Sequence, residues 1–178
     1  MVSEPLLHRM KILVVDDDRM SVTLLEQLLQ RHGYARVMGI TDSRSAVETC
    51  ATFDPDLVLL DLIMPDVDGF AVLDALRSDA SEDFLPIIVL TGDVSEESKA
   101  RALDAGATDF LVKPVSQTEA LLRIRNLLEM RRLYVAAENQ RLAMEDAVRE
   151  RTAELHETIA ELQAANQRLQ SSTTLSPI

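Results

Sequence analysis

Short apolar runs and amphipathic stretches alternate along the chain up to about residue 116. Five of the runs are rich in Val, Ile and Leu and are bounded by acids or turn-forming residues, which is typical of strands buried in a parallel sheet. They cover residues 11–15, 37–40, 57–60, 87–90 and 110–112. These five runs are the predicted strands.

The amphipathic stretches between the runs predict helices. Leucines recur at helical spacing ahead of Gly33, which stands where a left-handed C-terminal cap would be needed. Ser95 is a candidate N-cap and Gly106 a candidate helix end. Five helices are expected: before Gly33, over 43–52, 69–78 and 95–105, and from Gln117 onward. Because right-handed crossovers place helices on both faces, this alternation predicts an α/β fold with a doubly wound parallel sheet.

The fifth predicted helix has no proline or glycine between Gln117 and about Gln170, so it can continue as a rod of on the order of 80 Å. Residues at alternating four- and three-residue steps predict a coiled-coil seam in its second half. We call these residues the C-terminal seam: Val148, Thr152, Leu155, Ile159, Leu162, Asn166 and Leu169. Because a lone helix would expose these side chains over several turns, we expect a parallel homodimer rather than a solvated single helix.

A weaker seam precedes the C-terminal seam, and its register shifts near Val148. This upstream seam consists of Leu127, Met130, Tyr134, Ala137, Arg141 and Met144. The domain organisation expected from these patterns is an N-terminal tail over 1–9 and a globular domain over 10–130. A helical coiled-coil extension over 131–170 and a flexible tail over 171–178 follow.

The charge of the chain is unevenly distributed. The formal net charge is -12, and residues 1–118 hold 21 of the acidic and 10 of the basic residues. A domain this acidic is a poor direct binder of nucleic acid or of an anionic membrane. The single Cys50, the absence of a long apolar run and the absence of an export pattern at the N-terminus favour a cytoplasmic protein outside the membrane.

Polar residues stand where the predicted strands end. Asp16 and Asp17 close the first strand, Asp61 the third and Thr91 the fourth, while Lys113 follows the fifth. The carboxyl ends of parallel strands share one edge of a sheet, and ligands gather there. We therefore expect these five residues to form one site.

Three converging carboxylates repel one another unless they hold a divalent cation, and oxygen ligands favour Mg²⁺ together with a phosphate. Asp61 is the candidate nucleophile, because a carboxylate can attack phosphorus to give an acyl phosphate. Lys113 would neutralise the phosphoryl oxygens, and the Thr91 hydroxyl would donate a hydrogen bond to the product. The pattern predicts phosphoryl transfer to Asp61.

Four segments together resemble the receiver domains of bacterial response regulators, such as the chemotaxis and sporulation regulators. They are Ile-Leu-Val-Val-Asp-Asp at 12–17, Leu-Leu-Asp-Leu-Ile-Met-Pro-Asp-Val-Asp-Gly at 59–69, Val-Leu-Thr at 89–91 and Lys-Pro at 113–114. The resemblance covers about 10–130 and implies the strand order 2-1-3-4-5. Four motifs in the right order at the right strand ends are a specific signal.

The resemblance also implies the role of each residue. Asp16, Asp17 and Asp61 would hold Mg²⁺ together with the backbone carbonyl of Ile63. Asp61 would receive the phosphoryl group from the phosphohistidine of a sensor histidine kinase or of a histidine phosphotransfer protein. Gly69 and Pro114 would be structural, the latter through a cis peptide bond after Lys113.

Phe110 occupies the aromatic switch position of the family, although an ordinary core role fits it equally well. In the switch, Thr91 would move toward the phosphate and let the ring of Phe110 turn inward. Because Phe110 has no hydroxyl, packing alone would have to carry this change.

Two alternative interpretations use the same residue types. A phosphohydrolase of the haloacid dehalogenase type also combines an aspartate nucleophile with Mg²⁺, Thr and Lys, but its acids follow the first strand in an Asp-x-Asp pattern, whereas Asp16 and Asp17 are adjacent. His156 faintly resembles the phosphoacceptor segment of sensor kinases. No ATP-binding box follows it, so a solvated helix position is the better interpretation.

No output domain is visible in the sequence. Cyclase, phosphodiesterase and helix-turn-helix motifs are all missing from the 178 residues. Either the long helix itself engages a partner, or the chain is the front part of a longer regulator.

Overall fold

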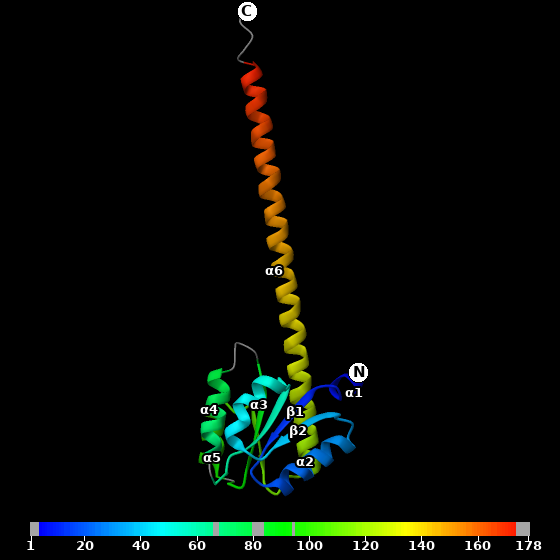
Figure 1. Cartoon of the computed structure of the whole chain (residues 1–178), viewed down its shortest axis with the longest axis vertical. Coiled ribbons are helices and arrows are strands. Elements are labelled where there is room, and N and C mark those ends of the chain that lie inside the picture. Colours follow the sequence, from blue (N-terminus) through cyan, green and yellow to red (C-terminus); the bar gives the residue numbers. More distant parts are fainter. Residues whose placement is uncertain (1–3, 66–67, 80–83, 94, 174–178) are drawn as a thin grey trace, which may run out of the picture. The chain divides into compact units, whose positions relative to one another are not determined.

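The computed structural model describes residues 4–65, 68–79, 84–93 and 95–173, and its centre is a five-stranded parallel sheet (Figure 1). The strands are β1 (Lys11–Val15), β2 (Arg36–Ile40), β3 (Leu57–Asp61), β4 (Ile87–Thr91) and β5 (Asp109–Val112). Their order is β2-β1-β3-β4-β5, which confirms the predicted topology. The predicted strands differ from the observed ones only at their ends.

The helices surround the sheet and follow the predicted sequence of elements. They are α1 (Glu4–Leu7), α2 (Arg19–Arg31), α3 (Ala46–Phe53), α4 (Gly69–Asp79), α5 (Glu96–Asp104) and α6 (Gln117–Thr173). The helix predicted over 43–52 is divided, because the Asp42 side chain accepts the amide of Arg44 and starts a 3-10 turn, η1 (Ser43–Ser45). The segment expected to be a tail contains α1, whose Leu7 is buried in the core. Residues 1–3 of that segment lie outside the described residues.

Alternate residues of the central strands face two separate apolar cores. Ile12 and Val14 of β1 lie in the core that α2 and α6 cover, whereas Leu13 and Val15 lie in the core that α3, α4 and α5 cover. All residues of β3 and β4 are buried. Fully burying an aliphatic side chain of this kind contributes about 1.5–3 kcal/mol, so the sheet is a rigid base for the loops at its carboxyl edge.

Local capping explains where the helices next to that edge begin and end. The Asp18 carboxylate accepts the amides of Met20 and Ser21 and so fixes the start of α2. Gly33 has a φ of 91° just beyond the C-terminal end of α2, as the sequence predicted. Ser95 caps α5 by accepting the amide of Ser98, which confirms that prediction as well.

The contacts divide the chain into two units, Met1–Tyr134 and Val135–Ile178, and α6 contributes to both. In the first unit, buried residues such as Ile124 and Leu128 pack α6 against the sheet. Near its end, Nη1 of Arg131 donates a hydrogen bond of 2.8 Å to the carbonyl of Phe84. In the second unit, every described side chain from 139 to 171 is exposed.

The structure corrects part of the upstream seam. Leu127 is buried in the core under α6, and the ring of Tyr134 lies 5.7 Å from the ring of Phe84. These two side chains pack on the globular unit and are not available to a second helix. The helix also continues to Thr173, beyond the predicted end at about Gln170, while residues 174–178 of the predicted tail lie outside the described residues.

None of the helices that the structure describes combines the length and the apolar character that a membrane span requires.

Candidate functional site

The polar residues predicted to form one site come from four neighbouring strand ends. Asp16 follows β1, Asp61 and Thr91 are the last residues of β3 and β4, and Lys113 follows β5. The strand register places Asp61 opposite Leu90 and Thr91 opposite Val112, so these ends lie at one level of the sheet. The site therefore rests on the fully buried strands β3 and β4 and on the ends of their neighbours β1 and β5.

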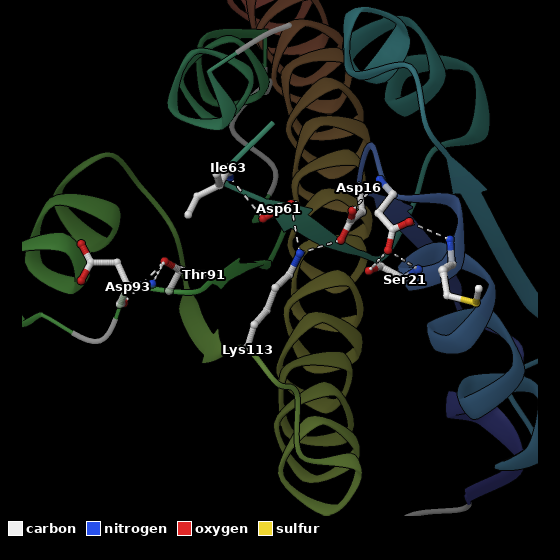
Figure 2. A network of polar contacts seen from close by, with 9 residues as sticks. Asp16, Ser21, Asp61, Ile63, Thr91, Asp93 and Lys113 are labelled. Atoms are coloured by element: carbon white, nitrogen blue, oxygen red, sulfur yellow. Dashed lines mark hydrogen bonds and ion pairs between the residues drawn. The ribbon is translucent and has the colours of Figure 1, made fainter. Parts of the chain in front are cut away.

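Lys113 joins the carboxylates of this site. Its Nζ lies 2.9 Å from Oδ2 of Asp16 and 3.0 Å from Oδ2 of Asp61, and Figure 2 shows its side chain between them. The side chains of Asp16 and Asp61 are 0% and 4% exposed, whereas that of Lys113 is 31% exposed. Two buried carboxylates thus share one ammonium group that still reaches solvent, which leaves one negative charge uncompensated among the three side chains.

The backbone fixes the remaining carboxylate oxygens. Oδ1 of Asp16 accepts the amide of Asp18 at 2.9 Å, and Oδ1 of Asp61 accepts the amide of Ile63 at 3.2 Å. Both oxygens of the Asp18 carboxylate accept amides at the start of α2, those of Met20 and Ser21, so this acid serves as the helix cap. The first two acids of the Asp-Asp-Asp run are therefore the ones left for the site.

Asp16, Asp17 and Asp61 form a cluster suited to a hard divalent cation. Each offers a carboxylate oxygen, and these atoms lie within 4.8 Å of one another. Asp17 is exposed, so the cluster has an open side on which waters or a phosphoryl oxygen could complete a coordination shell. An all-oxygen donor set that keeps open positions fits Mg²⁺.

The pKa shifts show how the charges are balanced. Burial raises the pKa of Asp61 above its ordinary value, although hydrogen bonds from Lys113 and the Ile63 amide act in the opposite direction. Burial lowers the pKa of Lys113, but its hydrogen bonds to Asp16 and Asp61 outweigh that effect and leave the pKa raised. A firmly protonated lysine thus faces a carboxylate whose ionised form is disfavoured by burial, and additional positive charge would be favourable here.

Thr91 lies at the same edge but is hydrogen-bonded elsewhere. Its Oγ1 accepts the amide of Asp93 at 3.0 Å, and among the described residues no hydrogen bond joins this hydroxyl to the side chain of Asp61 or Lys113 (Figure 2). The Thr91 carbonyl accepts the backbone amide of Lys113 at 2.8 Å. Its side chain is buried, so the hydroxyl is held within the fold on the side of the β4–α5 loop. The structure brings Asp16, Asp61 and Lys113 into contact. The Thr91 hydroxyl lies at the same edge of the sheet but is hydrogen-bonded to Asp93 instead.

Comparison with known proteins gives the same assignment as this geometry. The sequence matches the response regulator receiver domain family over residues 12–125. The chain belongs to this family. It is 41% identical over 137 residues to response regulator MprA of Mycobacterium leprae, covering 77% of this chain and 59% of that protein. It is 39% identical over 127 residues to the alkaline phosphatase synthesis transcriptional regulatory protein PhoP of Bacillus subtilis, covering 71% and 51%.

Among solved structures, chemotaxis protein CheY4 of Vibrio cholerae has a similar fold, with a TM-score of 0.62 at 31% identity. The similarity covers 67% of this chain and 98% of that chain, so a complete receiver domain corresponds to about two thirds of this chain. The chain spans only 59% and 51% of the length of MprA and PhoP. Phosphorylation by histidine kinases and Mg²⁺ binding at the acidic pocket are general properties of receiver domains.

The ring of Phe110 is partly buried, a position that fits neither a fully buried core residue nor a switch residue exposed to solvent. Its ring is partly buried against the core of the α3–α5 face, and the Nζ of Lys99 lies 5.4 Å from the ring centroid. The guanidinium carbon of Arg123 is 5.9 Å from the same centroid. The ring is thus neither fully in the core nor free in solvent.

Two structural predictions for the receiver are met by the backbone. The Lys113–Pro114 peptide bond is cis. Gly69 lies against the strand that carries Asp61: a Cβ at this position would be 2.5 Å from the Asp61 carbonyl oxygen and 2.5 Å from Cα of Leu62. Only glycine allows this approach.

The sequence analysis missed an apolar cavity of about 350 Å³ beside Lys113. It is lined by residues of α2 and of the β5–α6 loop, including Leu28 and Val115. Leu24 also lines it and is 59% exposed, although its helical spacing suggested a core position. The available signal was the excess of leucines on α2, which is more than one buried face requires.

Proposed function

We propose that this receiver accepts a phosphoryl group on Asp61 from the phosphohistidine of a sensor histidine kinase or a histidine phosphotransfer protein. The observation that carries the proposal is the contact of Lys113 with both Asp16 and Asp61 at the carboxyl edge of the sheet. A lysine held between two buried acids is an arrangement that stabilises added negative charge.

In the proposed reaction an Asp61 carboxylate oxygen forms a bond to phosphorus while the phosphorus–nitrogen bond of the donor histidine breaks. The bonding electrons return to the imidazole, and Asp61 becomes an acyl phosphate. Lys113 is placed to neutralise a phosphoryl oxygen, because its Nζ already lies 3.0 Å from Asp61. The Thr91 hydroxyl, after exchanging its bond to Asp93, would donate to the product.

Asp61 is the better nucleophile among the three acids. The side chain of Asp16 is fully buried, whereas that of Asp61 keeps 4% exposure, although both carboxylates have each of their oxygens engaged. Asp17 is exposed, but no ion pair among the described residues joins it to Lys113. Asp61 therefore both contacts Lys113 and keeps some contact with solvent, a combination that neither of the other two acids has.

Asp16, Asp17 and Asp61 would hold Mg²⁺, with the backbone carbonyl of Ile63 as a further ligand. When bound, the ion supplies positive charge that stabilises the phosphoryl oxygens in the transition state. Asp17 contributes little to the packing of the domain, so its proposed role is to bind the ion from the exposed side.

We further propose that residues 10–130 act as the receiver and 131–170 as a dimeric helical extension through the C-terminal seam. Phosphorylation would change the geometry or stability of this dimer and pass the signal to a partner or to an output domain. MprA and PhoP are longer than this chain, and the name of PhoP describes a transcriptional regulator. We propose no direct nucleic-acid or membrane contact for these residues, since the receiver is strongly acidic, and we propose the cytoplasm as their location.

The phosphoacceptor role is tested by incubating the full chain with acetyl phosphate and Mg²⁺ and measuring intact mass. We expect one retained phosphoryl group per chain, none in Asp61→Asn, and none when a chelator removes the ion. Continuous turnover of p-nitrophenyl phosphate without a retained group would instead favour the phosphohydrolase alternative and contradict the proposal.

The dimeric extension is tested by light scattering with Mg²⁺, with and without beryllofluoride as a stand-in for the phosphoryl group on Asp61. A dimer in both states would place the signal in the geometry of the dimer. A dimer that forms only with beryllofluoride, and not in Asp61→Asn, would make dimerisation the output. A monomer in every state would contradict this part of the proposal.

A further inference from the structure

The second half of α6 presents apolar side chains that no described part of the chain covers. Val148, Leu155, Ile159, Leu162 and Leu169 are 49–67% exposed. They belong to the unit Val135–Ile178, in which every described side chain from 139 to 171 is exposed. Burying such side chains is favourable because it removes apolar surface from water, so a surface that matches their spacing would be bound.

We infer that this surface binds a second copy of the chain with the two helices parallel and in register, so that Asn166 meets Asn166 of the second copy. The inference rests on the dimeric helix of the proposed function and adds its direction, its alignment and the residue that fixes them.

The residue types of the C-terminal seam fit a coiled coil of two parallel helices. With Val148 at position d of a heptad, Thr152, Ile159 and Asn166 fall at position a, and the leucines fall at d. β-Branched residues at a with Leu at d favour a two-stranded parallel coiled coil. The seam covers about three heptads, which is the lower end of the length from which such a pattern is recognised.

Two polar residues lie within the seam, Thr152 and Asn166, and they differ in whether their own helix supplies a hydrogen-bond partner for the side chain. Oγ1 of Thr152 donates a 2.8 Å hydrogen bond to the carbonyl of Val148, so its hydroxyl is satisfied within its own helix and the side chain can be buried. No hydrogen bond among the described residues involves the side chain of Asn166. Once buried by a second helix, this amide needs a donor and an acceptor from the other chain.

Only one alignment gives Asn166 such a partner. In a parallel, in-register pair each a residue meets its own copy, and two Asn side chains can exchange hydrogen bonds. In an antiparallel pair an a residue packs against a d residue, and every d residue of the seam is Val or Leu. The amide would then be buried without a hydrogen-bond partner in each helix, which disfavours the antiparallel pair.

The charges beside the seam tolerate the parallel alignment. Position g holds Arg151, and in a parallel pair it faces position e of the other helix, which holds His156. Arg151 is already paired with Glu154 of its own helix at 2.6 Å, and Arg149 lies 3.4 Å from Asp146. Each helix therefore neutralises its own arginines, and like charges are not left facing one another uncompensated.

Before the C-terminal seam, a charged triplet marks where the apolar contact ends. Arg141, at an upstream seam position, forms ion pairs with both Glu138 and Glu145 of the same helix. A charged side chain held in this way does not bury readily against a second helix. The tight part of the pairing is therefore assigned to the C-terminal seam.

The test is disulfide cross-linking of the full chain with Cys50→Ser and one new cysteine at a time. Leu155→Cys and Leu162→Cys each place the thiol in the seam and leave Asn166 intact, and Ala164→Cys places it on the opposite face as a control. A parallel, in-register pair brings both seam cysteines face to face with their copies. We expect both to give a cross-linked dimer several-fold more abundant than Ala164→Cys under mild oxidation.

An antiparallel pair can bring at most one of the two seam positions next to its own copy, because it has a single point of symmetry along the helix. Cross-linking at one position only, or at neither, would overturn the inference. Light scattering of the Cys50→Ser chain separates the causes. If the chain is a dimer but cross-links at only one seam position or at neither, the alignment alone is wrong. If the chain is a monomer, the dimer of the proposed function is wrong.

A second variant examines Asn166 directly. In the Leu155→Cys background, Asn166→Val removes the polar layer, and we expect a higher melting temperature of the helix together with a several-fold lower yield of the cross-link, because an apolar residue no longer excludes other alignments. An unchanged cross-link yield with no gain in stability would show that Asn166 does not lie in the seam.

Discussion

The ammonium nitrogen of Lys113 lies 3.0 Å from Oδ2 of Asp61, although β4 separates the strands from which the two residues come. The contact therefore spans the carboxyl edge of the sheet, above the end of β4. It is possible because the three strand ends lie at one level in the register. The lysine and the carboxylate define the point at which a phosphoryl group would be received.

Replacing Asp61 with Asn should stabilise the metal-free protein near neutral pH. The pKa of Asp61 is raised above its ordinary value of 3.8, so the contribution of this group to stability is greatest below that value and is lost as pH rises through the folded-state pKa. Asn cannot ionise and avoids that loss. We expect a gain on the order of 1 kcal/mol, or about 2–4 °C in Tm, in the presence of a chelator.

The control for Asp61→Asn is the same comparison at a pH below 3.8, where the carboxyl group is protonated in both states and the difference should vanish. A lower Tm for Asp61→Asn in the chelated protein near neutral pH would contradict the assigned cause of the pKa shift.

Replacing Lys113 with Ala should destabilise the metal-free protein, because two buried carboxylates lose their common partner. Removing one partner of a fully buried pair costs about 3–5 kcal/mol, and the partial exposure of Lys113 reduces this to roughly 1–2 kcal/mol. Chemical denaturation measures the loss. Mg²⁺ should restore part of it in Lys113→Ala, whereas Lys99→Ala, whose partner Glu96 is exposed, should change little in either condition.

Replacing Gly69 with Ala should destabilise the receiver and disturb Asp61. The new Cβ would lie 2.5 Å from the backbone of β3 and its following loop, which must shift. Overpacking of this kind costs about 1–3 kcal/mol. Gly92→Ala is the matched control, because a Cβ at Gly92 meets nothing within 4 Å. Equal melting temperatures for the two variants would show that the close approach at Gly69 is not a constraint.

Replacing Arg131 with Ala should loosen α6 from the globular unit. Arg131 is buried, donates a 2.8 Å hydrogen bond to the carbonyl of Phe84, and has its Nε 4.0 Å from Oδ1 of Asp56. We expect a loss of about 2 kcal/mol, against less than about 0.5 kcal/mol for Arg132→Ala, whose pair with Glu129 is partly exposed to solvent. Hydrogen exchange should show faster opening of α6 near Arg131 only in the first variant.

The fold and the contacts of the site were accessible from the sequence for a physical reason. Buried parallel strands carry uninterrupted apolar runs, and polar residues at their ends have to share the rim, so Asp16, Asp61 and Lys113 could be brought together without coordinates. The cap at Ser95 was equally predictable, since a side chain that satisfies a helix N-terminus acts locally.

Other features depend on packing between distant segments and left no local signal. The helix α1 is too short to show a period, and its Leu7 is recognised as core only once α1 has docked. Leu127 had the right spacing for the upstream seam, and only the position of the sheet decides that it faces the receiver. The bond of Thr91 to Asp93 likewise follows from the path of the loop after β4.

The central claim is that Asp61, rather than Asp16 or Asp17, carries the phosphoryl group. The most direct test is to phosphorylate the chain with acetyl phosphate and Mg²⁺, reduce it with borohydride, which converts an aspartyl phosphate to homoserine, and map the converted residue by peptide mass spectrometry. The account predicts homoserine at position 61 and at neither of the other two. Conversion of Asp16 or Asp17, or of none of the three in a chain that has retained phosphate, would contradict it.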